Sequence, residues 1–242
     1  MKRISVIIAS GKGENSVTRT VIEDILALVQ NKIDQIKVQY IYLNQINMTM
    51  CNECENCFNY GICPLDQKDD LYQIKDTLLQ SDYIFWGTGV ILHNVNPWMS
   101  ILFERLAVWG HIFGLAGVGS TVVVTGSTNG FQHVIAYMKK ILSFMGTSIG
   151  EVVALSYFDR MNEDIYRKSV VDEANKVVMV LNDKKQLNSN ELQEAIFTKM
   201  KQYMEMGALS DYERQYWEEN HLVEYDTFEQ YVSKAKVRKS LP

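Results

Sequence analysis

The chain has 242 residues, of which 47% are apolar and 22% are charged, and its formal net charge is −5. This composition is typical of a globular protein with one large domain, or one domain with an appendage. The acidic balance argues against nucleic-acid binding through bulk charge, and no run approaches the roughly 18 apolar residues of a membrane span. Four clustered cysteines do not resemble a secreted disulfide scaffold, so we expect a cytoplasmic protein.

The first half of the chain alternates short β-rich runs with amphipathic helical patterns. The predicted strands are residues 4–9, 36–43 and 83–87. The predicted helices are residues 18–30, a helix that starts at Asp69-Asp70, and residues 97–109. Asn96 and Pro97 have the residue types of a helix N-cap and first position. Four leucine and isoleucine residues form the expected buried face of the second helix: Leu71, Ile74, Leu78 and Leu79.

The same alternation continues with strands at residues 121–125 and 149–157 and helices at residues 131–145 and 163–181. Five strands that alternate with helices predict an α/β fold, a flavodoxin-like doubly wound parallel sheet of order 2-1-3-4-5. In this fold the ligand crevice lies at the carboxyl ends of strands 1 and 3.

The chain beyond the last strand–helix unit has a different pattern. Residues 1–182 are the expected domain, and residues 183–242 are a helical C-terminal extension. We expect amphipathic helices around residues 192–204, after Ser210, and over residues 225–239. The last one ends in a basic run, residues 234–239, that is either a solvated end or a binding patch.

A loop rich in glycine, serine and threonine, residues 10–18, follows the first strand and precedes a helix. Backbone N–H groups and the helix dipole attract anions at such a place, and hydroxyl groups and a lysine add donors. The loop has neither the Walker pattern nor G-x-G-x-x-G. We expect phosphate binding here, with a plain capped turn as the alternative.

All four cysteines lie in one short stretch with the spacing C-x2-C-x2-C-x5-C, followed by Pro64. Structural zinc sites usually combine two pairs across a longer spacer. The bacterial ferredoxin pattern C-x2-C-x2-C-x3-C-P has the same first three cysteines and the same trailing proline. The spacing favours an iron–sulfur cluster, with zinc, a disulfide pair or a loop that only packs as alternatives. The candidate ligands are Cys51, Cys54, Cys57 and Cys63.

The sequence resembles the flavodoxin-like NAD(P)H-dependent FMN reductases, and among them the iron–sulfur flavoproteins. Residues 9–18 stand where that family has its Gly-Ser-Pro-Arg…Ser-Asn-Thr phosphate loop. The four cysteines match the subgroup's compact loop, which binds a [4Fe-4S] cluster. Asp69-Asp70 matches its acidic pair, and Phe103-Glu-Arg105 matches its F-x-D-R helix end. The resemblance covers about residues 1–182.

Two loops depart from the family pattern. Gly89-Val-Ile-Leu92 replaces the Pro-Val-Tyr loop that lies against the flavin ring, so an aromatic wall is absent. In the phosphate loop, Gly11 replaces proline and Val17 replaces asparagine.

The resemblance implies that FMN lies in the loops after strands 1, 3 and 4. Side chains of the first loop would hold the phosphate, and backbone N–H groups of the other two would contact the ring and the ribityl chain. The implied cofactor-binding residues are Ser10, Lys12, Ser16, Val17, Thr18, Thr88, Gly89, Val90, Ile91, Leu92, His93, Asn94, Thr125, Gly126, Ser127, Asn129 and Gly130. His93 is the candidate proton donor near the ring, or alternatively a hydrogen-bonding loop residue.

Three functions follow as hypotheses. The first is an FMN-dependent oxidoreductase with a [4Fe-4S] cluster, which passes electrons between a reduced donor, NAD(P)H or ferredoxin, and an acceptor. The second is a cluster-free NAD(P)H-dependent FMN reductase that acts on a quinone or another small molecule. The third is a cofactor-less binding or scaffold protein. In the iron–sulfur relatives the cysteine loop approaches the flavin across a subunit boundary, so the resemblance implies a homodimer or homotetramer.

Overall fold

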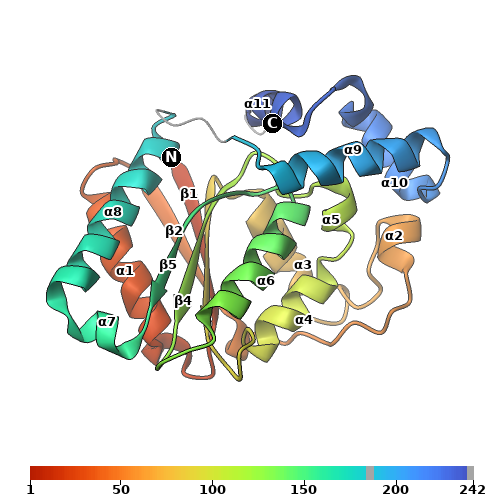
Figure 1. Cartoon of the computed structure of the whole chain (residues 1–242). Coiled ribbons are helices and arrows are strands. Elements are labelled where there is room, and N and C mark those ends of the chain that lie inside the picture. Colours follow the sequence, from red (N-terminus) through yellow and green to blue (C-terminus); the bar gives the residue numbers. More distant parts are fainter. Residues whose placement is uncertain (184–187, 239–242) are drawn as a thin grey trace.

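Five parallel strands form one sheet in the order β2-β1-β3-β4-β5, and the predicted topology is confirmed. The structure is a computed structural model that describes residues 1–183 and 188–238, without the side chains of residues 151 and 235–238. The strands are β1 (Lys2–Ala9), β2 (Ile36–Tyr42), β3 (Tyr83–Gly89), β4 (Gly119–Thr125) and β5 (Ser148–Leu155) (Figure 1).

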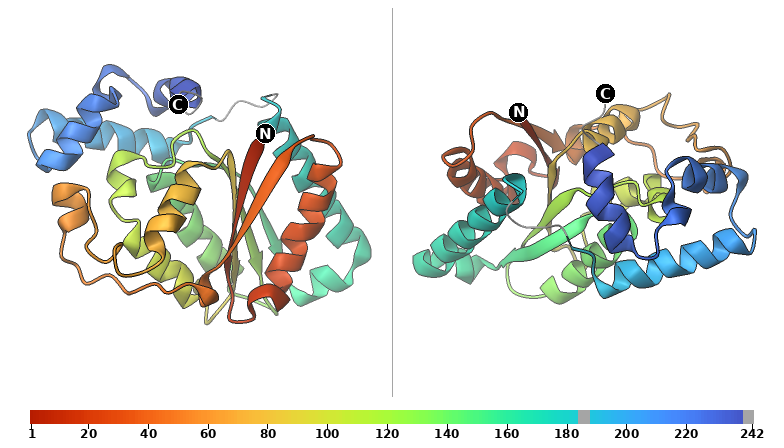
Figure 2. Two further views of the ribbon diagram at one scale, coloured as in Figure 1. Left: turned by 180° about the vertical axis from the view of Figure 1, so that it is seen from behind. Right: turned by 90° about the horizontal axis from the view of Figure 1, so that it is seen from above.

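Helices cover both faces of the sheet (Figures 1 and 2). One face carries α1 (Val17–Gln30) and α8 (Glu163–Leu181), which pack against each other. The other face carries α3 (Leu71–Leu79), α4 (Pro97–Arg105), α5 (Trp109–Ile112) and α6 (Phe131–Phe144). Short 3-10 turns follow β1 and β2, namely η1 (Gly13–Asn15) and η2 (Leu43–Gln45).

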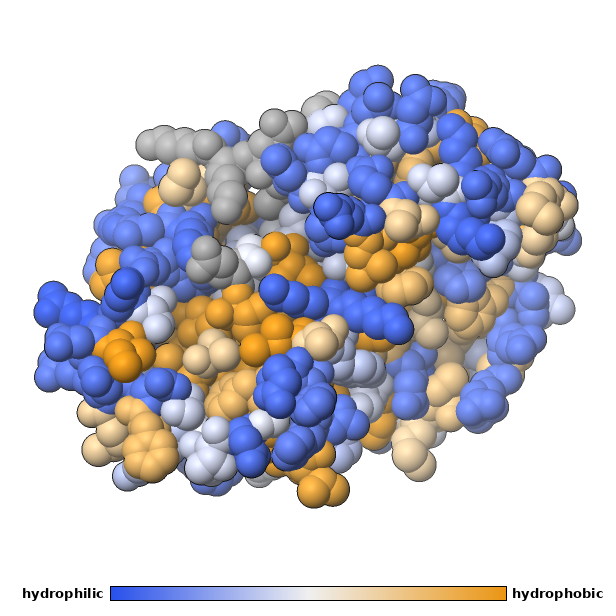
Figure 3. All heavy atoms as spheres, viewed as in Figure 1, coloured by the Kyte–Doolittle hydropathy of each residue, from blue (hydrophilic) through white to orange (hydrophobic). Residues whose placement is uncertain are grey.

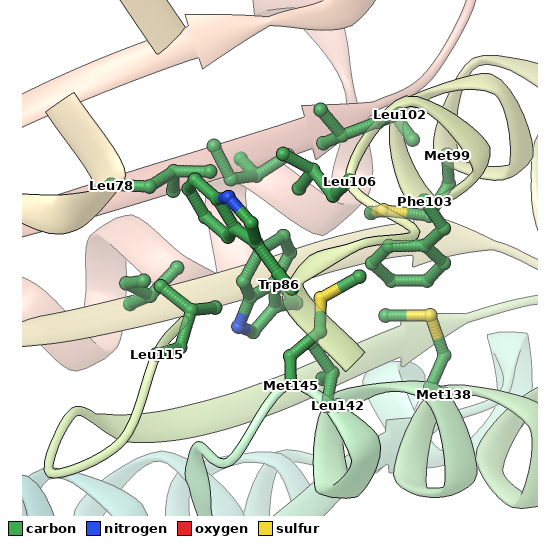
Figure 4. Close-up of a cluster of buried hydrophobic side chains, with 14 of the residues drawn as sticks. Leu78, Trp86, Met99, Leu102, Phe103, Leu106, Leu115, Met138, Leu142 and Met145 are labelled. Atoms are coloured by element: carbon green, nitrogen blue, oxygen red, sulfur yellow. The ribbon is translucent and has the colours of Figure 1, made fainter. Parts of the chain in front are cut away.

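Each face of the sheet has its own apolar core. Figure 4 shows the core between the sheet and α3, α4 and α6, around the fully buried Trp86 of β3. The indole Nε1 of Trp86 donates to Ser120 Oγ at 3.2 Å, so its polar edge is satisfied inside the core. Burial of such large rings dominates the energetics of a core, and this one fixes α4 and α6 relative to β3.

The C-terminal helices are α9 (Glu191–Glu205), α10 (Asp211–Glu219) and α11 (Phe228–Arg238), with the 3-10 turn η3 (Leu222–Glu224) between the last two. They share a third apolar core with Phe113 and Ala116 of the sheet domain. Four buried aromatic rings meet there: Phe113, Phe197, Trp217 and Phe228. The helices therefore pack on the sheet domain rather than projecting from it (Figure 2).

Several predicted boundaries were wrong. The strand expected over residues 149–157 ends at Leu155, because Ser156 and Asp159 form a capping box that starts α7 (Tyr157–Met161). The single helix expected over residues 97–109 breaks after Arg105 and resumes as α5. The last helix begins at Phe228 instead of residue 225, and the side chains of the basic run beyond Lys234 lie outside the described residues.

One predicted core residue is also wrong. Leu79 is 44% exposed, whereas the other three apolar residues of the predicted face are buried. Successive helical residues turn by about 100°, so a residue directly after Leu78 falls off the buried stripe. A five-residue helix, α2 (Asn56–Tyr60), was not predicted because it lies inside the cysteine stretch.

The outer edge of β5 is open on the face that Figure 3 shows, where apolar side chains gather. Within the described residues, β5 pairs with no strand other than β4. Grooves of about 440 and 490 Å³ flank this edge, the first beside Val152 and Ile165 and the second beside Ile149 and Leu192. In the described part of the chain we find no helix with the length and apolarity that a bilayer crossing requires.

Candidate functional site

Three loops leave the sheet at the carboxyl ends of β1, β3 and β4, which are neighbours in the sheet. We refer to residues 10–18, 88–96 and 126–130 as the strand-end loops. A buried hydrogen bond of 2.7 Å joins Thr18 Oγ1, at the end of the first loop, to Oγ1 of Thr125, the last residue of β4 directly before the third loop. The fold therefore brings the predicted phosphate and ring loops to one edge of the sheet, as a doubly wound fold requires.

The first strand-end loop turns tightly and ends in a capped helix. Ser10 Oγ accepts a hydrogen bond from the Lys12 amide at 3.2 Å, and the Lys12 side chain is exposed. Ser16 is the N-cap of α1, and its Oγ accepts from the Arg19 amide at 3.4 Å. The amides of Val17 and Thr18 lie in the first helical turn, where N–H groups have no intrahelical acceptor. The hydroxyl proton of Ser16 and these amides can therefore donate to an anion.

Several backbone N–H groups of the second strand-end loop already have acceptors within the protein. The Val90 amide donates to Thr125 O, and the Ile91 and Asn94 amides each donate to the other residue's carbonyl, all at 2.9 Å. The buried Thr88 hydroxyl accepts from the Asn96 amide at 3.1 Å. Of the predicted donors in this loop, the amides at the tip, on Leu92 and His93, are those best placed for a ligand.

The tip of this loop has an unusual backbone conformation. Leu92 and His93 have φ values of 46° and 62°, in the left-handed region that residues other than glycine rarely adopt. Leu92 is also 94% exposed, so no packing compensates for the conformation. Backbone strain of this kind often occurs where a loop contacts a ligand. The His93 ring stacks on His133 of α6 with centroids 5.4 Å apart.

The third strand-end loop is held against the second by one side chain. A methyl group added at Gly130 would lie 2.9 Å from Val90 Cγ1, and one added at Gly126 would lie 3.2 Å from Val90 Cγ2. Gly130 also has φ +86° and caps α6. Ser127 and Asn129 are exposed between these two glycines. Gly130 therefore leaves no room for a side chain where the two loops meet, and a side chain at Gly126 would require its neighbours to shift.

Two neighbours of the strand-end loops were not predicted. Trp98 of α4 lies against the first loop, since a methyl group added at Gly11 would be 3.7 Å from its ring. On the other side, the Tyr157 amide donates to Ser127 O at 3.2 Å, and Tyr157 and Phe158 of α7 are exposed. The capping box at Ser156 was the signal that could have placed this helix beside the third loop.

The cysteine loop, residues 51–63, lies beside α4 and α5 rather than in the sheet (Figure 1). Cys51 and Cys54 are exposed, whereas Cys57 and Cys63 are half-buried. The Glu53 amide lies 3.5 Å from Cys51 Sγ. Burial raises the pKa of the Cys57 thiol, and the nearby Cys63 raises it further.

The thiols are a suitable donor set for iron or zinc, but they do not converge in this conformation. Among the described residues, no three His, Cys, Asp or Glu side chains come close enough to hold one ion. The loop brings four thiols onto one short segment, with an amide directed at one of them. Four thiols are thus suitable ligands for a cluster, but in this conformation their sulfur atoms are not arranged around one common site.

One buried arginine holds both ends of this loop. Arg105 Nη1 donates to Thr49 O at 2.7 Å, before the first cysteine. The same guanidinium donates to Asp69 and Asp66 at 2.6 and 2.8 Å, after the last one. Lys75 Nζ lies 2.6 Å from Asp66 and completes the network. The resemblance pointed to Asp69 and Arg105 as motif residues but not to this pairing.

The model of the NADPH-dependent FMN reductase family matches residues 3–159. The chain belongs to that family. Family membership makes it a flavin-dependent oxidoreductase and agrees with strand-end loops that offer donors to a phosphorylated ligand. The predicted family is thereby confirmed.

Two curated relatives of this FMN reductase family member are named iron–sulfur flavoproteins. One, from Archaeoglobus fulgidus, is 23% identical over 203 residues, which cover 81% of this chain and 90% of that protein. The other, from Clostridioides difficile, is 24% identical over 102 residues, which cover 42% of this chain and 45% of that protein. The subgroup named by the resemblance is the one to which these relatives belong.

Solved structures share the fold at low sequence identity. An NADH:FMN oxidoreductase in its apo form superimposes with a TM-score of 0.56 and 18% identity, over 79% of this chain and 92% of that chain. An azoreductase from Bacillus anthracis gives a TM-score of 0.54 and 12% identity, over 74% of this chain and 99% of that chain. These similarities confirm the flavodoxin-like architecture.

Proposed function

We propose that this flavin-dependent oxidoreductase binds a [4Fe-4S] cluster on its cysteine loop and passes electrons between a reduced donor, NAD(P)H or ferredoxin, and an acceptor. The observation that carries the proposal is the set of four free thiols within residues 51–63 of an FMN reductase fold. The names of the two curated relatives support it.

The strand-end loops would hold FMN, which when bound supplies two-electron chemistry that can proceed in one-electron steps. The Ser16 hydroxyl and the first-turn amides of α1 would bind its phosphate, with Lys12 as the nearby cation. The amides of Leu92 and His93 would donate to the ring, where preorganised donors favour negative charge. His93 would be the proton donor, and its stacking on His133 limits the orientations of its ring.

An absorption spectrum of anaerobically purified protein, with iron and sulfide analysis, tests this proposal. We expect flavin absorption bands with an additional broad shoulder that gives the protein a brown colour, and equimolar amounts of iron and sulfide. Substitution Cys54→Ala should remove the shoulder and leave the flavin bands, because Cys54 is exposed and packs in no core. Flavin bands without iron in the parent protein would contradict the cluster.

The second candidate is a cluster-free NAD(P)H-dependent FMN reductase that acts on a quinone or another small molecule. The observation that favours it is the position of the cysteine sulfur atoms. Within the part of the chain that the structure describes, they do not come together as a group that could hold a metal ion. Under this function the spectrum shows flavin bands alone, and Cys54→Ala leaves NAD(P)H oxidation unchanged.

We also propose that copies of this chain associate. The open edge of β5 and the two grooves beside it, of which the one beside Ile149 and Leu192 is mainly apolar, are a surface that a second copy could cover (Figure 3). Light scattering should then give the mass of a dimer or tetramer. Replacement of Val152 by lysine should lower that mass if β5 lies in the interface.

A further inference from the structure

The C-terminal extension contacts the cysteine loop through α10. Figures 1 and 2 show α10 beside α2, the short helix that contains Cys57. The two helices are in contact, and the partly buried Cys57 and Phe58 pack against the same core as Tyr212 and Tyr216 of α10. Ser210 and Phe58, which form part of this contact, are 152 positions apart in the sequence, so the contact is formed only in the folded state.

The first residue pair is a hydrogen bond to the end of α2. Ser210 Oγ donates to Phe58 O at 2.6 Å. Because α2 spans only Asn56–Tyr60, its last carbonyls have no intrahelical donor, and this hydrogen bond gives one of them a partner from the C-terminal extension. Ser210 is also the N-cap of α10, where its Oγ accepts from the Glu213 amide at 3.2 Å. One hydroxyl therefore satisfies the start of α10 and the end of α2.

The second pair places a ring directly on the backbone of the cysteine loop. A methyl group added at Gly61 would lie 2.2 Å from Tyr212 Cε2, so the ring leaves no room for a side chain there. Gly61 has φ +70° and ends α2, between Cys57 and Cys63. The Tyr212 ring thus fixes the turn that sets the relative positions of the last two cysteines.

A third contact connects this arrangement to the sheet domain. The Phe58 ring lies 4.9 Å from the His111 ring of α5, and His111 Nδ1 lies 2.5 Å from Glu213 Oε1. Trp217 Nε1 donates to His111 O at 3.0 Å. The first two turns of α10 therefore contact both α2 and α5.

We propose that α10 positions the Cys57–Cys63 half of the cysteine loop, with Ser210 and Tyr212 as the positioning residues. The C-terminal extension is then a brace for the sulfur ligands, complementary to Arg105, which holds the two ends of the loop. The identity of the ligand that these thiols bind rests on the proposed function, whereas their positioning by α10 does not depend on it.

The rate of cysteine alkylation by iodoacetamide, measured residue by residue by mass spectrometry on the full-length protein without iron, tests the brace. Ser210→Ala should raise the alkylation rate of Cys57 and Cys63 about tenfold, because loss of the part-buried hydrogen bond to Phe58 O makes local opening more frequent. Cys51 and Cys54 are already exposed, and their rates should stay unchanged.

Asn190→Ala is the matched control. Asn190 caps α9 with a capping box of the same kind, but its side-chain amide donates to Ser143 Oγ of α6, whereas Ser210 Oγ donates to Phe58 O of α2. Asn190→Ala should weaken the C-terminal extension and leave the alkylation rates of all four cysteines within about twofold of those of the parent protein. Equal acceleration by both variants would overturn the proposal, since the effect would then be general loosening of the extension.

A pair of substitutions tests the Tyr212 contact. Gly61→Ala should speed alkylation of Cys57 and Cys63, and Tyr212→Phe should not, because it keeps the ring. Tyr212→Ala removes the ring that clashes with the added methyl group. In the double variant Gly61→Ala/Tyr212→Ala, the increase in alkylation rate should therefore be smaller than the combined increases of the two single variants. Simple additivity would contradict a direct contact.

Iron and sulfide uptake separates this inference from the proposed function. Anaerobic incubation with ferrous iron and sulfide should load the parent protein and the Asn190→Ala variant, and load Ser210→Ala to less than about half. If the parent takes up no iron, the cluster proposal fails, while the alkylation rates still decide the role of α10. Full loading of Ser210→Ala with unchanged alkylation would overturn the positioning role.

Discussion

Arg105 Nη1 donates to Asp69 Oδ2 at 2.6 Å, and neither side chain is accessible to solvent. The guanidinium also binds Thr49 O and Asp66, on opposite sides of the cysteine loop. Burial lowers the pKa of Arg105, but the hydrogen bonds that its guanidinium donates to the carboxylates of Asp69 and Asp66 outweigh that effect and raise it. A charged residue of α4 therefore serves as the fixed point of the loop that contains all four thiols.

Arg105→Ala should destabilise the protein by about 3–5 kcal/mol, because it leaves the buried carboxylate of Asp69 without its partner. Glu104→Ala is the control, since Glu104 is the exposed neighbour on the same helix. Urea unfolding followed by tryptophan fluorescence measures both. Equal unfolding free energies for the two variants would show that the network has no energetic role.

The same ion pair predicts an acid limit to stability. Burial acts to raise the pKa of Asp69, but hydrogen bonds from Arg105 and from the Thr49 and Leu71 amides hold it below the ordinary value of an aspartate. A carboxyl whose pKa is lower in the folded state stabilises the fold above the unfolded pKa and loses that contribution as the pH falls through the folded value. The unfolding free energy should therefore drop below about pH 4. Asp69→Asn should have lower stability at pH 7 and a shallower dependence on pH in this range.

The sequence predicted the sheet because its signal is local and repeated. Buried strands such as β1 and β4 read as continuous β-branched runs, and the alternation with helices then allows few topologies. Boundaries were missed where one side chain decides them. Ser156 ends β5 by capping α7.

The candidate site was predicted less completely than the fold. Loop positions follow from strand ends, so the strand-end loops could be found from the sequence. The contacts that hold the cysteine loop could not, because Ser210–Phe58 and Arg105–Thr49 join residues separated by 152 and 56 positions. Such pairs leave no periodic pattern. The internal use of the Val90 and Asn94 amides was likewise visible only in three dimensions.

Leu92→Asn should stabilise the apo protein by about 0.5–1 kcal/mol. Leu92 has φ +46° and is 94% exposed, so the leucine pays for a left-handed conformation and gains no burial. Asparagine adopts this conformation at lower cost. Ile91→Asn is the control at the preceding, half-exposed position, where φ is negative, and it should not stabilise. Thermal unfolding compares them, and a lower melting temperature for Leu92→Asn would refute strain at this turn.

Gly130→Ala should weaken FMN binding because it separates the second and third strand-end loops. Gly130 has φ +86°, and the added methyl group would lie 2.9 Å from Val90 Cγ1 and 3.2 Å from the Cα atom of His93. The left-handed conformation alone costs about 1 kcal/mol, so the loop shift needs a control for that cost. Gly207→Ala is that control, because Gly207 has φ +67° and open space around the added methyl group.

Titration of the apo protein with FMN, followed by quenching of flavin fluorescence, distinguishes the two variants. Both should lose some stability, but only Gly130→Ala should raise the dissociation constant, by about tenfold or more, which is about 1.4 kcal/mol of binding free energy. Because Val90 touches both glycines of the third loop, adding Val90→Ala should restore part of the affinity by relieving the clash. Unchanged FMN affinity in Gly130→Ala would mean that the flavin does not depend on the contact between these two loops.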